Sequence, residues 1–217
     1  RELHYEAALR CNQGKESIGI NLKSQEGQAV VHQLIRKADI VMHNFRPGVP
    51  TRLGIDYEKL TEFNPSLIYL SANGYGAAGP GAKRPSTHPI PGAAMGGAGY
   101  QAGHVPERLL NIDELRHTSQ RLFLANEVNP DPNTAVVVCA SVLMGLTARD
   151  QTGKGQQIFI DMFGANAYAN FDAMVDFEGK PPRPSLNDDL KGPHPLYRLY
   201  RAKNSWVFLG MKRNSEW

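Results

Sequence analysis

Apolar residues between positions 18 and 72 follow two alternating patterns. Three apolar runs, at residues 18–22, 40–42 and 67–72, have the length of β-strands. Between the first two runs, the apolar residues of 30–38 recur at the intervals of one helix face, and Ser24 precedes them as a helix-entry residue. Alternation of strand, helix and strand is typical of a parallel sheet. The pattern therefore predicts an α/β fold.

A second short helix is expected after the strand at 40–42. Asp56, Leu60 and Phe63 have helical spacing, and Asn64 and Pro65 then force a turn before the next strand. Repetition of this unit predicts a doubly wound, Rossmann-like parallel sheet, in which ligands bind at the carboxyl ends of the strands.

A long apolar stretch covers residues 133–149 and is apolar nearly all round, which predicts a buried helix. Asp131 and Pro132 stand directly before it. Aspartate is a preferred N-cap and proline is favoured at the first helical position, so capping alone explains the pair. The helix dipole would also keep the carboxylate ionised, as a carboxylate nucleophile requires. Both interpretations of Asp131 stay open at this point.

The last third of the chain predicts a change of domain. Residues 163–177 are expected to form a helix, followed by a proline-rich segment, and two strands are expected at 195–201 and 206–209. The chain starts at Arg1 rather than methionine and stops soon after the last strand, so we expect it to be part of a longer protein. The expected parts are a large domain that lacks its N-terminal part, a linker and the start of a smaller α+β domain, at residues 1–178, 179–190 and 191–217.

Glycine and proline are concentrated between residues 74 and 103. Such a stretch allows the backbone to approach a ligand closely, and it is equally typical of surface loops. It does not fit a dinucleotide fingerprint, because no G-x-G-x-x-G lies between a predicted strand and a helix.

Composition excludes several classes of protein. The 217 residues are 41% apolar and 21% charged, and 24 basic against 21 acidic residues leave a net charge of +3, too small an excess to favour nucleic acid. Cys11 and Cys139 are far apart, and no apolar run approaches the roughly 20 residues of a membrane helix. We therefore expect a cytoplasmic protein that does not bind membranes. The seven histidines show no metal-binding spacing, so no metal is expected.

Several motifs in order carry a family resemblance. The two most specific are N-F-R-P-G at residues 44–48 and T-G-K-G-Q at 152–156, with Asp131 upstream of the latter. The chain resembles the class III CoA-transferases, which include formyl-CoA and carnitine CoA-transferases and the related α-methylacyl-CoA racemases. Further matching segments lie at residues 12–15, 20–23, 38–43, 64–69, 74–76, 79–80 and 84–85.

The resemblance implies a transferase that passes coenzyme A, its co-substrate, from an acyl-CoA donor to a small carboxylic acid. Asp131 would be the nucleophile and would form a mixed anhydride and then an aspartyl-CoA thioester. It also implies an interlocked homodimer for the full-length protein. The positions that match CoA contacts in such enzymes are Asn44 and Phe45 for pantetheine or adenine, Lys23, Arg52 and Arg84 for phosphates, and Met162 for the wall of the site.

Each of these positions has an ordinary structural alternative. The three cations are also explained as solvated surface charges, and Met162 as a core residue. Two other functions stay open. A racemase would need a histidine base where this chain has Thr87, with His88 one residue later. A catalytically silent CoA-binding segment of a larger or tandem protein would keep the motifs without turnover.

Overall fold

The computed structural model describes residues 9–87, 89–95, 97–103, 106–124, 130–182, 189 and 191–211. Its named helices and strands are α2 (Gln25–Ile35), β1 (Ile40–His43), α3 (Val49–Arg52), α4 (Tyr57–Thr61), β2 (Ile68–Asn73), α5 (Pro89–Ala94), α6 (Gly97–Ala102), α7 (Ile112–Leu124), α8 (Pro130–Thr152), β3 (Gln156–Asp161), α9 (Met162–Ala169), α10 (Phe171–Met174), β4 (Tyr197–Arg201) and β5 (Trp206–Gly210).

Three parallel strands form the central sheet in the order β1-β2-β3. Because the strands point the same way, His43, Asn73 and Asp161 end them at one edge, which we call the carboxyl edge. The α/β fold and the predicted strands at 40–42 and 67–72 are confirmed. The order shows no reversal of the kind that marks a doubly wound sheet, so that arrangement stays a prediction.

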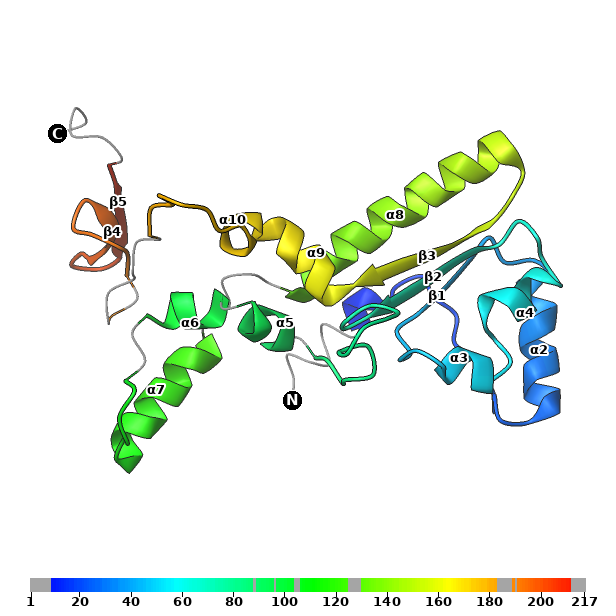
Figure 1. Cartoon of the computed structure of the whole chain (residues 1–217), viewed down its shortest axis with the longest axis horizontal. Coiled ribbons are helices and arrows are strands. Elements are labelled where there is room, and N and C mark those ends of the chain that lie inside the picture. Colours follow the sequence, from blue (N-terminus) through cyan, green and yellow to red (C-terminus); the bar gives the residue numbers. More distant parts are fainter. Residues whose placement is uncertain are drawn as a thin grey trace.

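Helices α2, α3 and α4 lie on one side of the sheet (Figure 1). Ser24 caps α2 by accepting a hydrogen bond from the Gly27 amide at 3.1 Å, as the sequence predicts for a helix-entry residue. Ile35 of α2 and Leu60 of α4 pack on Tyr69 of β2 and are almost fully buried. This cluster is the core that fixes one face of the sheet.

Helix α8 lies on the opposite side and runs back against the strand direction (Figure 1). Gly145 is its contact point, since a Cβ there would lie 2.9 Å from Ile158 Cδ1 and 3.3 Å from Ile68 Cγ2. At the far end of the helix, Arg149 Nη1 pairs with Asp39 Oδ1 at 3.0 Å. The first turn of α8 therefore lies toward the carboxyl edge and its last turn at the opposite, amino edge.

The T-G-K-G-Q motif joins α8 to β3 at this amino edge. Gly153 has φ +71° and its amide donates to the Arg149 carbonyl at 2.7 Å, which ends the helix. Gly155 runs against β2 so closely that a Cβ would lie 2.2 Å from the Leu67 carbonyl oxygen. The motif therefore has a structural role, at the end of α8 that is remote from Asp131.

Three expectations are wrong. Residues 18–22 form no strand, and Asn21 instead accepts from the Ser24 amide in the turn that leads to α2. Helix α8 is not buried all round, because only its sheet-facing stripe is covered and Leu143 and Met144 are 64% and 73% exposed. The helix expected at 163–177 is broken at Asn170 into α9 and α10.

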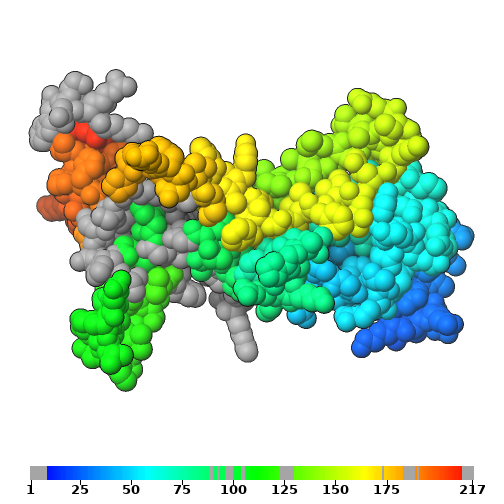
Figure 2. Space-filling model, in the orientation of Figure 1, coloured from blue at the N-terminus to red at the C-terminus, as the bar shows by residue number. Residues whose placement is uncertain are grey.

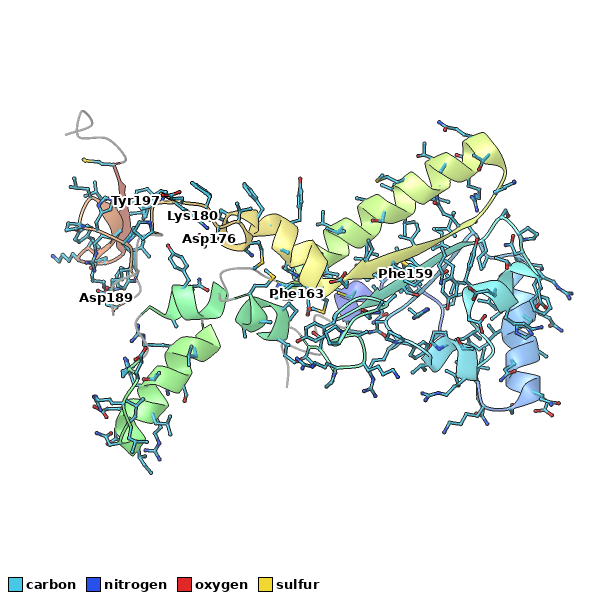
Figure 3. All side chains as sticks on the ribbon, in the orientation of Figure 1. Phe159, Phe163, Asp176, Lys180, Asp189 and Tyr197 are labelled. Carbon is cyan, nitrogen blue, oxygen red and sulfur yellow. The ribbon has the colours of Figure 1, made fainter. Side chains whose placement is uncertain are left out.

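The glycine-rich stretch contains helices α5 and α6, and α7 follows it. The sequence analysis predicts none of these three helices. Antiparallel β4 and β5 confirm the two predicted strands near the C-terminus. Figure 3 labels Tyr197 on β4 and Asp189 nearby, far from the central sheet along the molecule. The domain limits at residues 178 and 190 stay predictions.

Helix α8 also meets the length and hydropathy criteria for a membrane span, unlike any other helix in the described ranges. This differs from the sequence analysis, which expects no apolar run near the length of a membrane helix. The helix packs along the sheet and is tied down at both ends, which accounts for it as an element of the α/β domain.

Candidate active site

Asp131 lies in the first turn of α8, which begins one residue earlier at Pro130. The helix therefore begins earlier than the capping interpretation of Asp131 expects. The residue is exposed, and its carboxylate stands near the positive end of the helix dipole. The carboxylate thus lies where a soluble substrate can reach it.

Buried Asn166 of α9 fixes this first turn. Its Nδ2 donates to the carbonyl oxygens of Pro130 at 3.3 Å and Met162 at 2.6 Å, and its Oδ1 accepts from Asn133 Nδ2 at 3.2 Å. Thr134 Oγ1 donates to the same Pro130 carbonyl at 2.7 Å. Asn166 is 0% exposed, so a fully enclosed amide holds the start of α8 against the start of α9.

The start of α9 in turn lies at the carboxyl edge. Asp161 caps the helix by accepting from the Gly164 amide at 2.5 Å, and the Phe163 amide donates to the Gly74 carbonyl at 3.1 Å. Figure 3 shows Phe163 at the junction of β3 and α9, beyond the end of the strand that carries Phe159. Asp131 therefore belongs to the same edge as the glycine-containing loop that follows β2.

A cavity of about 150 Å³ opens on the other face of the sheet at this edge. Its floor is the row His43, Ser71 and Phe159, which are register partners across the three strands. Its rim includes Phe45 and Arg46 of the N-F-R-P-G turn. Further lining residues are Pro47, Gly48, Pro50, Thr51, Asp56, Tyr57, Glu58, Tyr69, Asn73, Ala77 and Gln157.

Two titratable side chains in the cavity wall are held neutral at pH 7. Burial lowers the pKa of His43. Burial raises the pKa of Tyr69, and the carboxylates of Asp56 and Glu58 raise it further. Aromatic rings surround His43, with the Phe45 ring stacked 5.4 Å and the Tyr69 ring edge-on 5.2 Å from the imidazole. The wall therefore combines aromatic rings with polar and charged side chains, among them Arg46, Asp56 and Glu58.

The predicted CoA contacts are only partly brought together. Phe45 lines the cavity, whereas Asn44 is exposed outside it. Met162 is the first residue of α9. Its carbonyl oxygen accepts a hydrogen bond from Asn166 Nδ2, which also donates to Pro130 in the first turn of α8. The cations Lys23, Arg52 and Arg84 are exposed and do not line the cavity.

Several residues of the site are missed by sequence patterns. His43 precedes N-F-R-P-G but lies in a strand-like run, and Ser71 is one of many serines. Asn166 is recognisable only as an asparagine inside a helix, where asparagine is unfavourable without a local role.

The racemase base cannot be placed, because His88 lies outside the described residues. Thr87 is exposed. In the described ranges no group of three His, Cys, Asp or Glu residues could hold a metal ion.

The geometry defines a class of protein: an α/β domain with a cavity and an exposed carboxylate at one edge of a parallel sheet, where ligands of such sheets bind. Comparison with known proteins identifies the family. Residues 4–217 match the sequence model of CoA-transferase family III, and the chain belongs to that family. The resemblance seen in the motifs is thereby confirmed.

Among its relatives, the chain is 37% identical over 155 residues to acetyl-CoA:oxalate CoA-transferase of Acetobacter aceti, covering 70% of this chain and 36% of the relative. It is 34% identical over 150 residues to the beta subunit of succinyl-CoA–L-malate CoA-transferase of Chloroflexus aurantiacus, covering 69% and 34%. A crystal structure of a CAIB/BAIF family protein from Brucella suis matches with a TM-score of 0.64 and 26% identity, over 91% of this chain and 48% of that chain. The chain thus spans about a third of the length of these curated relatives.

Proposed function

We propose that the protein carrying this chain transfers coenzyme A from an acyl-CoA to a carboxylic acid, with Asp131 as the nucleophile. The observation that supports this role most directly is the position of Asp131, exposed in the first turn of α8 at the carboxyl edge of the sheet. A carboxylate nucleophile must be accessible to the acyl-CoA, and exposed Asp131 meets this condition.

In the first half-reaction the Asp131 carboxylate attacks the thioester carbonyl of the donor. A carbon–oxygen bond forms, the carbon–sulfur bond breaks, and CoA thiolate leaves a mixed anhydride behind. The thiolate then attacks the aspartyl carbonyl carbon and expels the donor acid as its carboxylate. Asp131 is left as a CoA thioester, and the leaving donor acid carries one of the former Asp131 oxygens.

In the second half-reaction the acceptor carboxylate attacks this thioester. CoA thiolate leaves again, and a mixed anhydride of Asp131 and the acceptor forms. Attack of the thiolate on the acceptor carbonyl releases the new acyl-CoA and restores the Asp131 carboxylate. Each step has a good leaving group, which a direct exchange of acyl groups would lack.

The cavity beside Phe45 supports a CoA-binding role for this edge. We propose that it holds an uncharged part of CoA, and that the pantetheine arm crosses the carboxyl edge past the Gly74 loop toward Asp131. Exposed Lys23, Arg52 and Arg84 would contact phosphate groups only outside the cavity. The other partners we propose are a small carboxylic acid and a second copy of the full-length protein, in the cytoplasm.

Acyl exchange in the intact protein that carries this sequence tests the proposal. Acetyl-CoA and oxalate, the pair in the name of the Acetobacter relative, are the first substrates, followed by other acids. Asp131→Ala is expected to lower exchange at least about 10³-fold, because alanine has no carboxylate to carry the acyl group.

Asp113→Ala is the matched control, since Asp113 is an exposed carboxylate in the first turn of α7. It removes a carboxylate from the equivalent part of another helix and should leave exchange unchanged. Undiminished exchange in Asp131→Ala would contradict the proposal. CoA binding without any exchange would favour a silent CoA-binding segment, and inversion of a 2-methylacyl-CoA without a new thioester would favour a racemase.

A further inference from the structure

His43 is the centre of a hydrogen-bond cluster in the cavity wall that the chemical steps do not use. Its Nδ1 lies 3.2 Å from the Phe45 amide nitrogen. Its Nε2 lies 2.9 Å from the Tyr69 hydroxyl oxygen and 3.0 Å from Ser71 Oγ. One imidazole therefore connects β1, β2 and the N-F-R-P-G turn.

These partners determine which ring nitrogen carries the proton. The Phe45 amide can only donate, so Nδ1 must accept with its lone pair. The Tyr69 hydroxyl donates to the Ile55 carbonyl at 2.9 Å, so its oxygen is left to accept from Nε2–H. The cluster thus requires a neutral imidazole with its proton on Nε2.

The same assignment fixes what Ser71 can do. Because Nε2 carries a proton, the Ser71 hydroxyl cannot donate to it. Among the described residues, His43 is the only hydrogen-bond partner of Ser71 Oγ. Ser71 is 7% exposed and lines the cavity, so its hydroxyl proton is available to a molecule bound there.

The charges around the imidazole limit what that molecule can be. Asp56 and Glu58 line the cavity from the α4 side, together with the phenol rings of Tyr57 and Tyr69. Arg46 is the cation of the lining. Two carboxylates against one guanidinium disfavour a phosphate and favour an uncharged acceptor such as an amide carbonyl.

We propose that His43 is a positioning residue that holds the Phe45 amide through Nδ1 and directs the Ser71 hydroxyl proton toward an amide carbonyl of the pantetheine arm of CoA. The choice of CoA as the ligand rests on the proposed function, whereas the protonation state of the His43 imidazole does not. Ser71 is the specificity-determining donor, and His43 acts through it.

Protonation of His43 should disrupt this arrangement. A proton on Nδ1 would face the Phe45 amide proton, with two donors 3.2 Å apart. Because burial lowers the pKa of His43 below its ordinary value of 6.5, the neutral form prevails at pH 7. The contribution to CoA binding is present above the lowered pKa and is lost as pH falls through it.

The first experiment records long-range proton–nitrogen NMR spectra of the imidazoles in the ligand-free intact protein, with His43→Gln for assignment. The expected result is a neutral His43 ring with the proton on Nε2 at pH 7.5. The Phe45 amide signal should shift with the same midpoint as His43 when pH is lowered. A proton on Nδ1 at pH 7.5 would overturn the proposal whether or not CoA binds.

The second experiment measures CoA binding by calorimetry at pH 7.5. Ser71→Ala should weaken binding about 2- to 10-fold, the effect of one neutral hydrogen bond. Ser66→Ala is the matched control, because Ser66 lies before the same strand, outside the cavity, and donates to Asn64 Oδ1 at 2.8 Å. It should bind CoA as the unmodified protein does.

Two amide variants separate the functions of the ring nitrogens. The Asn amide oxygen can replace Nδ1 as acceptor for Phe45, and the Gln amide nitrogen can replace Nε2 as donor. His43→Gln should therefore keep more of the Ser71 effect than His43→Asn. In both variants the affinity relative to unmodified protein should rise as pH falls below the His43 pKa, because neither amide titrates. Because the affinities of the variant and of the unmodified protein are compared at the same pH, the titration of CoA itself affects both equally and does not change their ratio.

Equal CoA affinity of Ser71→Ala and unmodified protein, or a ratio that does not vary with pH, would overturn the proposal. Failure of the unmodified protein to bind CoA would overturn the proposed function together with the Ser71 ligand. That failure would leave the NMR result on His43 standing as a property of the free protein.

Discussion

At the scale of single residues, Asn166 links the fold to the proposed chemistry. Its side chain contacts the first turn of α8 and the first residue of α9, and these are the two places where Asp131 and Met162 are found. A fully buried amide with partners on all sides cannot shift without leaving polar groups unpaired. The position of Asp131 therefore depends on a residue that does not touch substrate.

Replacing this amide should be costly. Asn166→Ala removes the donor to Pro130 and the acceptor for Asn133, and we expect the free energy of unfolding to fall by about 1–3 kcal/mol. Denaturant titration measures the change. Tyr168→Ala on the same helix is the control, because Tyr168 is 82% exposed, and should change stability by less than about 0.5 kcal/mol. Equal stability of the two variants would contradict the anchoring role.

At the scale of elements, the joint between α8 and β3 is the most tightly constrained point. Gly155→Ala would place a Cβ 2.2 Å from the Leu67 carbonyl oxygen, so the backbone must move and the bond from Gln156 N to that oxygen is strained. We expect a loss of about 1–3 kcal/mol or more in thermal or denaturant unfolding.

Gly19→Ala is the control for this substitution. A Cβ at Gly19 would meet nothing within 4 Å, and the backbone there has an ordinary φ. It should be neutral within about 0.5 kcal/mol. Equal free energies of unfolding of the two alanine variants would show that the close approach at Gly155 does not contribute to stability.

The start of α7 has a pH-dependent cap. Asn111 Oδ1 accepts from the Glu114 amide and Glu114 Oε2 accepts from the Asn111 amide, both at 3.0 Å, which is a reciprocal capping box. Hydrogen bonds from Arg108 and from the Asn111 amide lower the pKa of Glu114 from 4.5 to about 2.

A lowered carboxyl pKa means that the contribution of the cap is complete above pH 4.5 and is lost as pH falls toward 2. We expect amide hydrogen exchange at the start of α7 to accelerate over that interval, relative to the intrinsic rate. The Glu114→Gln variant should lack this pH dependence. An identical pH profile in both proteins would show that Glu114 does not titrate with the cap.

Patterns in the sequence predict the elements whose stability is local. Strands β1 and β2 and helices α2 and α4 follow from periodicity, a cap at Ser24 and the turn at Asn64 and Pro65. The unpaired segment at 18–22 has strand-like composition, but a strand also needs a neighbour, which composition cannot supply.

The candidate site is less predictable because it is assembled from distant segments. The motif that contains Phe45 indicates one wall of the cavity, and Asp131 stands out before a long apolar helix. Asn166 and Ser71 act through contacts with residues 36 and 28 positions away, and no local pattern encodes such contacts. The exposure of Leu143 likewise depends on how few elements cover α8, which no pattern within the helix reveals.

At the scale of the molecule, α8 lies at the surface, at the upper right of Figure 2, and carries exposed apolar side chains. Val136 and Leu143 lie seven residues apart on this helix and are 69% and 64% exposed, and Met144 is 73% exposed. Contiguous apolar surface of this kind is typical of a face that another surface covers. The interlocked homodimer implied by the family resemblance stays a prediction.

This exposure has a measurable consequence for the 217-residue chain. We expect concentration-dependent association in sedimentation velocity, weakened in a Leu143→Glu, Met144→Glu double variant because burying two carboxylates is unfavourable. Leu109→Glu, at an exposed loop position away from α8, is the control and should not change association. A chain that stays monomeric at high concentration without these substitutions would contradict the expectation.

The central claim is that Asp131 forms covalent acyl intermediates, and trapping tests it most directly. The intact protein is incubated with an acyl-CoA, treated with hydroxylamine, which converts an anhydride or thioester to a hydroxamate, and digested for mass spectrometry. We predict a hydroxamate on Asp131, dependent on the acyl-CoA, and none on the first-turn carboxylate of Asp113. Acyl exchange that proceeds while Asp131 stays unmodified would contradict the account.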